Sequence, residues 1–258
     1  MNRLPVVFAG HGDPRNALRD NAWSRALARL GAEIGRPRAV VCVSAHWTTD
    51  GLRATSEAAP RTIHDFSGFP PELYAFRYPA PGSPETAALV RGALGGEAAL
   101  DDGGWGLDHG AWSVLAHLYP RADVPVVELS VDPARSGGFH LDVGRRLAPL
   151  RERGILILGS GNVVHNLARL DWSPRAAPEP WCAEFDAHVK ARTEAGDADS
   201  LAGDPAAMPG GALSVPTPEH WLPYLCVLGA AAGDAVAWEH EGLEHGSLSM
   251  RTASFGLR

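Results

Sequence analysis

The sequence predicts a single α/β domain, spanning residues 1–258, in which a central, mostly parallel or mixed sheet is flanked by helices. The chain has 258 residues, with 45% hydrophobic and 21% charged side chains, which fits one globular domain. Short apolar runs alternate with segments of helical spacing. This alternation is typical of an α/β architecture.

Four apolar runs have the length of buried strands, and they cover residues 4–9, 39–45, 124–131 and 155–158. Between them, helical spacing and composition predict helices over residues 21–34, 84–94, 110–119 and 141–152. Gly154 supplies a stop for the last of these helices.

Two later segments differ from this pattern. Residues 196–211 (GDADSLAGDPAAMPGG) are rich in small and turn-forming residues, so we expect a mobile surface loop that interrupts the domain without dividing it. Residues 246–255 alternate apolar and polar side chains, as an edge or outer strand does.

Composition excludes several classes of function. The formal net charge of −7 argues against a nucleic acid or an anionic membrane as the main partner, so a small molecule is expected. No stretch approaches the roughly 18 to 20 apolar residues that span a bilayer, and the N-terminus lacks the features of a signal peptide. The three cysteines share no CxxC spacing, which predicts a reducing, cytoplasmic location without a disulfide framework or a cysteine zinc site.

Five of the 11 histidines stand out by position. His11 and His46 end predicted strands, His165 follows another strand in GSGNVVHN, His109 lies at a predicted helix start, and His220 follows the segment expected to be a loop. In an open α/β sheet the ligand crevice lies beyond the carboxyl ends of the strands. These side chains are therefore the candidates for a functional site, and for most of the other six histidines a structural role is the preferred interpretation.

His11 and His46 predict a shared metal site, because imidazole is the commonest metal ligand in proteins. We expect Asn162 and His165 to face the crevice, where a neutral imidazole is a candidate acid or base. Asp108, directly before His109, is either a helix cap or a catalytic group.

Either Glu219 or His220 supplies a third ligand. Adjacent side chains point about 100° apart on a helix and to opposite faces of a strand, so one pocket is expected to receive only one of the two. His220 is the preferred ligand and Glu219 the minority alternative.

Four tryptophans lie near the candidate histidines, and core packing is the first interpretation for each. The sharper alternative is that one or two of them form an aromatic wall for a planar substrate ring. These residues are Trp47, Trp105, Trp112 and Trp221. The substrate contacts stay unassigned.

Eight uncommon motifs occur in order along the chain: GHGDP, SAHW, TIHDFSGFP, YPAPGSP, WGLDHGAW, GSGNVVHN, PTPEHWLP and GSLSM. Together they resemble the class III extradiol ring-opening dioxygenases of the LigB superfamily, in particular the DOPA 4,5-dioxygenase-like branch. The resemblance runs from His11 to about Met250. It implies a single α/β domain, a non-haem divalent metal, and oxidation of a catechol such as L-DOPA by O2.

The resemblance also implies residue roles. His11 and His46 match two metal ligands, and His220 matches the third in this branch, where the protocatechuate branch has Glu. His165 matches the catalytic acid/base, which is sometimes counted as a fourth ligand. His109 resembles a second active-site histidine that contacts the substrate hydroxyl or bound oxygen.

Fe(II) is the metal expected for activity, because three ligands on one face leave positions for two catechol oxygens and O2. Zn(II) also suits a site of three or four histidines and binds more tightly. A zinc-dependent hydrolase is therefore an alternative, although the chain lacks an HExxH motif. A non-catalytic, Memo-like binding protein of the same superfamily is another. The sequence leaves open the natural catechol, the regiochemistry of cleavage and whether the chain forms a homo-oligomer.

Overall fold

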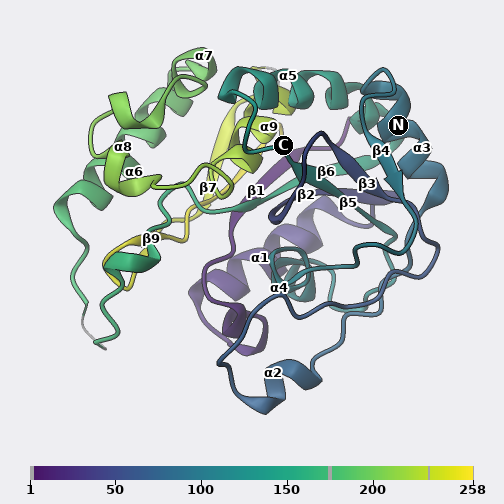
Figure 1. The fold of residues 1–258 in the computed structure, drawn as a ribbon, viewed down its shortest axis with the longest axis horizontal. Coiled ribbons are helices and arrows are strands. Elements are labelled where there is room, and N and C mark those ends of the chain that lie inside the picture. The colour runs from purple at the N-terminus through teal and green to yellow at the C-terminus, as the bar shows by residue number, and fades with distance from the viewer. Residues whose placement is uncertain (1–2, 174–175, 232, 258) are drawn as a thin grey trace.

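The computed structural model describes residues 3–173, 176–231 and 233–257, and it confirms a single α/β domain (Figure 1). One mixed sheet of eight strands has the order β4-β3-β5-β2-β6-β1-β10-β7, and a two-stranded sheet pairs β8 with β9. The strands are β1 Val6–Gly10, β2 Ala39–Thr48, β3 Arg53–Thr55, β4 Ala99–Asp101, β5 Val126–Val131, β6 Ile155–Gly161, β7 Val236–His240, β8 Leu243–Glu244, β9 Leu248–Ser249 and β10 Thr252–Phe255.

The four strands expected from the apolar runs form the parallel centre of the sheet, β5-β2-β6-β1. All residues of β1, β5 and β6 are buried, which explains their continuous apolar sequences. Because the central strands are parallel, their carboxyl ends meet at one edge of the sheet.

The prediction of an edge or outer strand over residues 246–255 is wrong. This segment forms β9 and then β10, and β10 lies inside the large sheet, antiparallel to both β1 and β7. Its four residues are all buried. The alternating sequence suggested one exposed face, but β7 pairs along its outer side and both faces are covered.

The helices are α1 Ala22–Ile34, α2 Pro71–Ala75, α3 Pro84–Ala93, α4 His109–Leu118, α5 Gly137–Leu147, α6 Pro180–Glu194, α7 Ala198–Leu201, α8 Gly211–Ser214 and α9 Leu222–Ala231. Short 3₁₀ helices are η1 Pro14–Leu18, η2 Ala148–Arg153, η3 Leu167–Arg169 and η4 Pro205–Ala207. Gly154 ends η2 with a φ of 75°, which agrees with the stop expected there.

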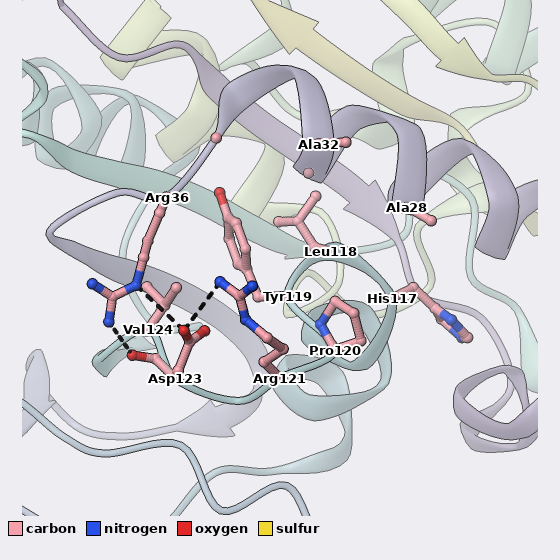
Figure 2. Close-up of a pocket in the computed structure, with 12 residues that line it drawn as sticks. Ala28, Ala32, Arg36, His117, Leu118, Tyr119, Pro120, Arg121, Asp123 and Val124 are labelled. Atoms are coloured by element: carbon pink, nitrogen blue, oxygen red, sulfur yellow. Dashed lines mark hydrogen bonds and ion pairs between the residues drawn. The ribbon is translucent and has the colours of Figure 1, made fainter.

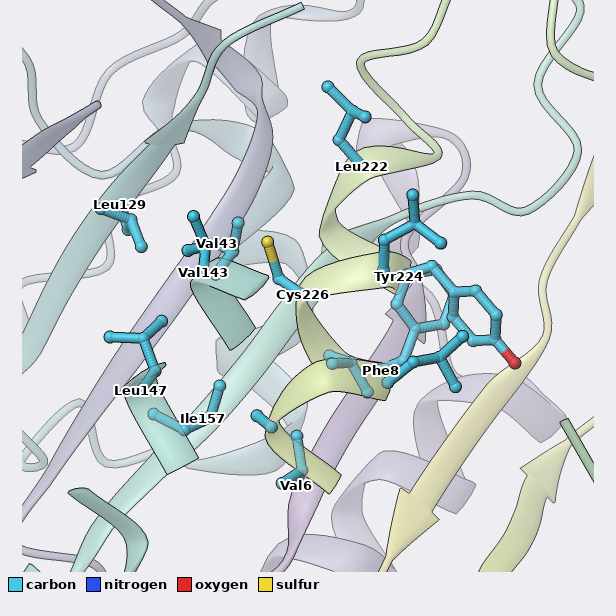
Figure 3. Close-up of a cluster of buried hydrophobic side chains, with 14 of the residues drawn as sticks. Val6, Phe8, Val43, Leu129, Val143, Leu147, Ile157, Leu222, Tyr224 and Cys226 are labelled. Atoms are coloured by element: carbon cyan, nitrogen blue, oxygen red, sulfur yellow. The ribbon is translucent and has the colours of Figure 1, made fainter. Parts of the chain in front are cut away.

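Two helical layers enclose the sheet (Figure 1). Helices α1 and α4 cover one face, around Val40, Cys42 and Leu156 of the strands, and α5 and α9 cover the other. Figure 3 shows the second of these clusters, in which Phe8 of β1 packs against Tyr224 of α9 with ring centroids 4.8 Å apart.

Helix α9 is apolar on every side, and all ten of its residues are buried. It lies very close to α5, because an added Cβ at Gly144 would be 1.9 Å from the Cys226 carbonyl oxygen, and one at Gly229 would be 1.9 Å from the Leu141 carbonyl oxygen. In the part of the chain that the structure describes, no helix combines the length and apolar content needed to cross a membrane.

The segment 196–211 contains more regular structure than the loop expected there. Asp197 caps α7 by accepting a hydrogen bond from the Ser200 amide, and Asp204 caps η4 through the Ala206 amide. Leu201 is fully buried. The turn-forming residues of this sequence therefore begin short helices that pack onto the domain.

Candidate metal centre

The structure brings the five selected histidines together at the carboxyl edge of the central strands. His11 directly follows β1, His46 lies near the end of β2, and His220 lies in the turn before α9. The ring centroid of His11 is 4.9 Å from that of His46 and 5.3 Å from that of His220, and those of His46 and His220 are 5.0 Å apart. Three imidazoles from distant parts of the sequence are thus neighbours in space.

The hydrogen bonds of His11 fix which of its nitrogens carries the proton. Its Nδ1 lies 3.0 Å from Ser160 Oγ. Ser160 donates its only hydroxyl proton to the Gly110 carbonyl at 2.6 Å, so it must accept from His11. His11 Nε2 is therefore left with a free lone pair.

His46 has the same arrangement. Its Nδ1 lies 3.1 Å from Asp65 Oδ2, and a carboxylate only accepts hydrogen bonds, so this nitrogen carries the proton. His46 Nε2 is 3.1 Å from His11 Nε2. Two nitrogen lone pairs thus face each other at short range, and a cation between them removes their repulsion.

His220 completes the set. Its Nδ1 lies 3.3 Å from Glu219 Oε1, whereas its buried Nε2 has no hydrogen-bond partner among the described residues. A buried nitrogen with no partner is costly unless a ligand satisfies it. The donor set of His11, His46 and His220 therefore fits a divalent metal, with each Nδ1 held by an oxygen as is usual for metal-bound histidine.

Two of these imidazoles, His11 and His220, are held in the neutral form. Burial and the neighbouring imidazoles lower the pKa of His11 and His220 well below the usual value. A neutral imidazole keeps the lone pair that a metal ligand needs.

His109 and Asp65 form the next layer of the site. His109 is the first residue of α4, and its Nδ1 lies 2.8 Å from Asp65 Oδ2. Burial and His46 lower the pKa of His109. Although burial alone would raise it, hydrogen bonds from His109 and His46 lower the pKa of the Asp65 carboxyl. Asp108 is a helix cap, as its side chain accepts from the Ala111 amide at 3.0 Å.

His165 contacts the cluster through His220. Its ring is stacked on His220, with centroids 3.5 Å apart and planes 7° from parallel. Burial and the charges of His46 and His109 lower its pKa to about 3. Nitrogen or oxygen atoms of His165, Glu219 and His220 lie within 4.8 Å of one another, as do nitrogen atoms of His11, His46 and His109.

The expectation that one pocket would receive only Glu219 or His220 is wrong, because both line the same cavity. The expectation assumed a regular helix or strand at this position. These residues instead lie in a turn between α8 and α9, where adjacent side chains can point the same way.

The histidines lie at the base of a cavity of about 410 Å³, a size that suits a small ligand. Its walls include Phe66, Phe69 and Trp172. Arg15, paired with Asp13, lies with its guanidinium 5.8 Å from the Phe69 ring and 5.7 Å from the Trp172 ring. An aromatic wall is present, but it comes from residues outside the four tryptophans considered.

Those four tryptophans have structural contacts instead. Trp47 and Trp105 stack on each other with centroids 5.8 Å apart, and Trp112 Nε1 donates to the Ile63 carbonyl. Trp221 packs against Phe185 and Tyr224 in the core. The core-packing interpretation holds for Trp47, Trp112 and Trp221, which are buried, whereas Trp105 is only partly buried. None of the four is among the described residues lining the cavity.

A second cavity, of about 330 Å³, lies between α1 and the segment after α4 (Figure 2). Arg36 and Arg121 both pair with Asp123 there, with nitrogen–oxygen distances of 3.4 and 3.2 Å. His117 Nε2 lies 2.8 Å from the Asn16 carbonyl oxygen. The arginines and the aspartate of this second cavity are already paired with one another. The cavity lined by the histidines is therefore the better candidate for a catalytic site.

Sequence reasoning missed Asp65 and Ser160. Asp65 follows His64 in a loop, and only its contacts with two imidazoles from other segments distinguish it from a surface aspartate. Ser160 lies in β6 between Gly159 and Gly161, and its only signal was its place near a strand end.

Comparison with known proteins agrees with this geometry. Residues 5–256 match the LigB family, described as the catalytic LigB subunit of aromatic ring-opening dioxygenase. The chain is 46% identical to an Escherichia coli K12 protein named 4,5-DOPA dioxygenase extradiol, covering 98% of this chain and 95% of that protein. A Beta vulgaris protein of the same name is 35% identical over 95% and 96% of the two chains. The crystal structure of an uncharacterized Escherichia coli K12 protein aligns with a TM-score of 0.82 and 41% identity, covering 98% of this chain and all of that one.

Proposed function

Because the chain belongs to the LigB family of aromatic ring-opening dioxygenases, we propose that it opens the ring of a catechol with O2 in a metal-dependent reaction. The family and the names of its relatives confirm the expected enzyme class, an extradiol dioxygenase. A catechol such as L-DOPA, or another substituted catechol, is the proposed substrate.

One observation carries the proposal of a metal. The Nδ1 atoms of His11, His46 and His220 each lie within 3.3 Å of an oxygen atom, which leaves three Nε2 atoms for one ion. His11, His46 and His220 would hold it. Three ligands leave open positions for substrate, which is typical of non-haem iron oxygenases.

Fe(II) is the proposed metal for activity, because it supplies the redox chemistry that lets triplet O2 react with a closed-shell catechol. Zn(II) fits the same donor set and has no redox chemistry. A zinc-loaded sample is therefore expected to be inactive in ring opening.

The other residues bind substrate and move protons. His109 Nδ1 is held by Asp65, so its Nε2 is free to accept a phenolic proton as a general base. His165, which is stacked on His220 and is neutral because burial lowers its pKa to about 3, is the alternative base; whichever imidazole accepts the phenolic proton would return that proton during ring opening. Phe66 and Phe69 offer apolar surface to a planar ring and help to exclude water.

O2 uptake tests this function. The protein is reconstituted anaerobically with Fe(II) and then mixed with O2 and a panel of catechols, including L-DOPA. We expect uptake, together with the absorbance of a ring-opened product. Matched controls are the zinc-loaded protein and a His220→Ala variant, neither of which should consume O2.

Two outcomes would point elsewhere. Ester or amide hydrolysis by the zinc-loaded protein, without O2 uptake by the iron-loaded protein, would favour a hydrolase. Failure of every catechol with iron demonstrably bound would favour a binding protein that keeps the family fold.

A further inference from the structure

We propose that Asp65 is a positioning residue that sets the working nitrogen of two histidines at once, a metal ligand and a base. This inference rests on the proposed function only for the names given to those two roles. In structural terms, one carboxylate oxygen of Asp65 stabilises the Nδ1-protonated form of both His46 and His109.

The first observation is that Asp65 Oδ2 lies close to one nitrogen of each imidazole. This oxygen is 2.8 Å from His109 Nδ1 and 3.1 Å from His46 Nδ1. An ionised carboxylate has no proton to donate, so both facing nitrogens must carry one. Each ring therefore keeps its lone pair on Nε2.

The other carboxylate oxygen fixes Asp65 itself. Asp65 Oδ1 accepts a hydrogen bond from the His109 backbone amide at 2.9 Å, at the first turn of α4. The positive end of the helix dipole favours a carboxylate at this position. Asp65 is therefore held by the helix that carries His109, and it orients His46 from a different strand.

Ring placement supports the shared role. The centroids of His46 and His109 are 3.8 Å apart, closer than other pairs in the cluster except His165 and His220. Without a common acceptor, two imidazoles at this distance are free to rotate or to adopt the Nε2-protonated form. That form would leave no lone pair on the nitrogen needed for the metal or for the substrate proton.

The test uses zinc-loaded protein, which is diamagnetic and needs no turnover. ¹⁵N-histidine NMR of the wild-type protein is expected to show His46 and His109 both protonated at Nδ1. In Asp65→Asn, a side-chain amide has one acceptor oxygen in place of two. Because zinc on Nε2 would itself keep the His46 proton on Nδ1, the resonance that should disappear is that of the His109 Nδ1 proton. Zinc affinity, measured by chelator competition, should fall about 10- to 100-fold, as is usual when a group supporting a metal ligand is lost.

Asp13→Asn is the matched control, because Asp13 is a carboxylate of the same cavity wall that pairs with Arg15 and contacts neither imidazole. This variant should keep both Nδ1 resonances and the wild-type zinc affinity. With iron, Asp65→Asn should lower kcat more than it raises KM, which a general loss of packing would not produce selectively.

The inference is overturned if either histidine of the wild-type zinc protein is protonated at Nε2, a result that holds even if Asp65→Asn does not fold. It is also overturned if Asp65→Asn keeps the His109 Nδ1 resonance and an unchanged zinc affinity. Neither measurement depends on ring opening, so a protein that proves inactive with catechols would leave this test intact.

Discussion

The imidazole of His165 lies flat against that of His220, with ring centroids 3.5 Å apart and planes 7° from parallel. His220 Nδ1 is already held by Glu219, and its Nε2 is the atom that fits the metal. His165 therefore supports one face of the proposed ligand without being needed to fix its proton.

From this contact we expect His165→Ala to lose turnover and keep its metal. Loss of a general acid or base lowers kcat by about 10²- to 10⁴-fold. Zinc affinity by chelator competition should stay within tenfold of the wild type. A loss of metal comparable to that of His220→Ala would instead assign His165 as a fourth ligand.

Glu128 gives a prediction about pH. Its side chain is fully buried, and burial together with the charge of Asp108 raises the pKa of this carboxyl well above the usual value. The native state therefore binds a proton that the unfolded chain releases, and its stabilising contribution decreases as pH rises above about 4.3, the ordinary Glu value. Urea unfolding should show Glu128→Gln gaining stability relative to the wild type between pH 5 and pH 8.

The exposed glutamate Glu72 is the control for this experiment. The free energy of unfolding of Glu72→Gln should show the same pH dependence as that of the wild type across this range. A constant difference between Glu128→Gln and wild type would show that Glu128 binds no extra proton in the native state.

Close packing of α5 on α9 predicts that Gly144→Ala is strongly destabilising. The added Cβ would lie 1.9 Å from the Cys226 carbonyl oxygen, so the two helices must separate. Overpacking of this kind costs about 1–3 kcal/mol. Gly138→Ala in the same helix meets nothing nearer than Ser136 Oγ at 3.8 Å, and it should be neutral or stabilising in thermal and urea unfolding.

Trp172 is expected to bind the substrate without contributing to stability. It lines the cavity mouth, and its side chain is 61% exposed. Trp172→Ala should raise KM for the catechol severalfold with little change in kcat, the pattern for a contact made equally in the ground and transition states. Leu100→Ala, which removes an exposed apolar side chain of β4 outside the cavity wall, should leave both constants unchanged. An unaltered KM for Trp172→Ala would exclude this residue from the substrate site.

Much of the fold follows from local sequence. The continuous apolar runs predict β1, β2, β5 and β6 because a parallel strand buried on both faces needs no polar alternation. The last strand was assigned to the wrong place in the sheet, because its alternation carries no information about whether β7 pairs beside it. Short strands such as β3 and β4 have too few residues for a periodic signal.

The sequence by itself determined the α/β class and the five histidines, because strand ends and uncommon motifs can be recognised along the chain. Only the tertiary structure decided how those imidazoles are oriented. Asp65 and Ser160 reach His46 and His11 from segments far away in sequence, and their hydrogen bonds set which nitrogen of each ring carries a proton. The aromatic side chains of the cavity wall come from two loops far apart in sequence, one with Phe66 and Phe69 and the other with Trp172. Such contacts depend on the relative positions of folded elements, which no local pattern encodes.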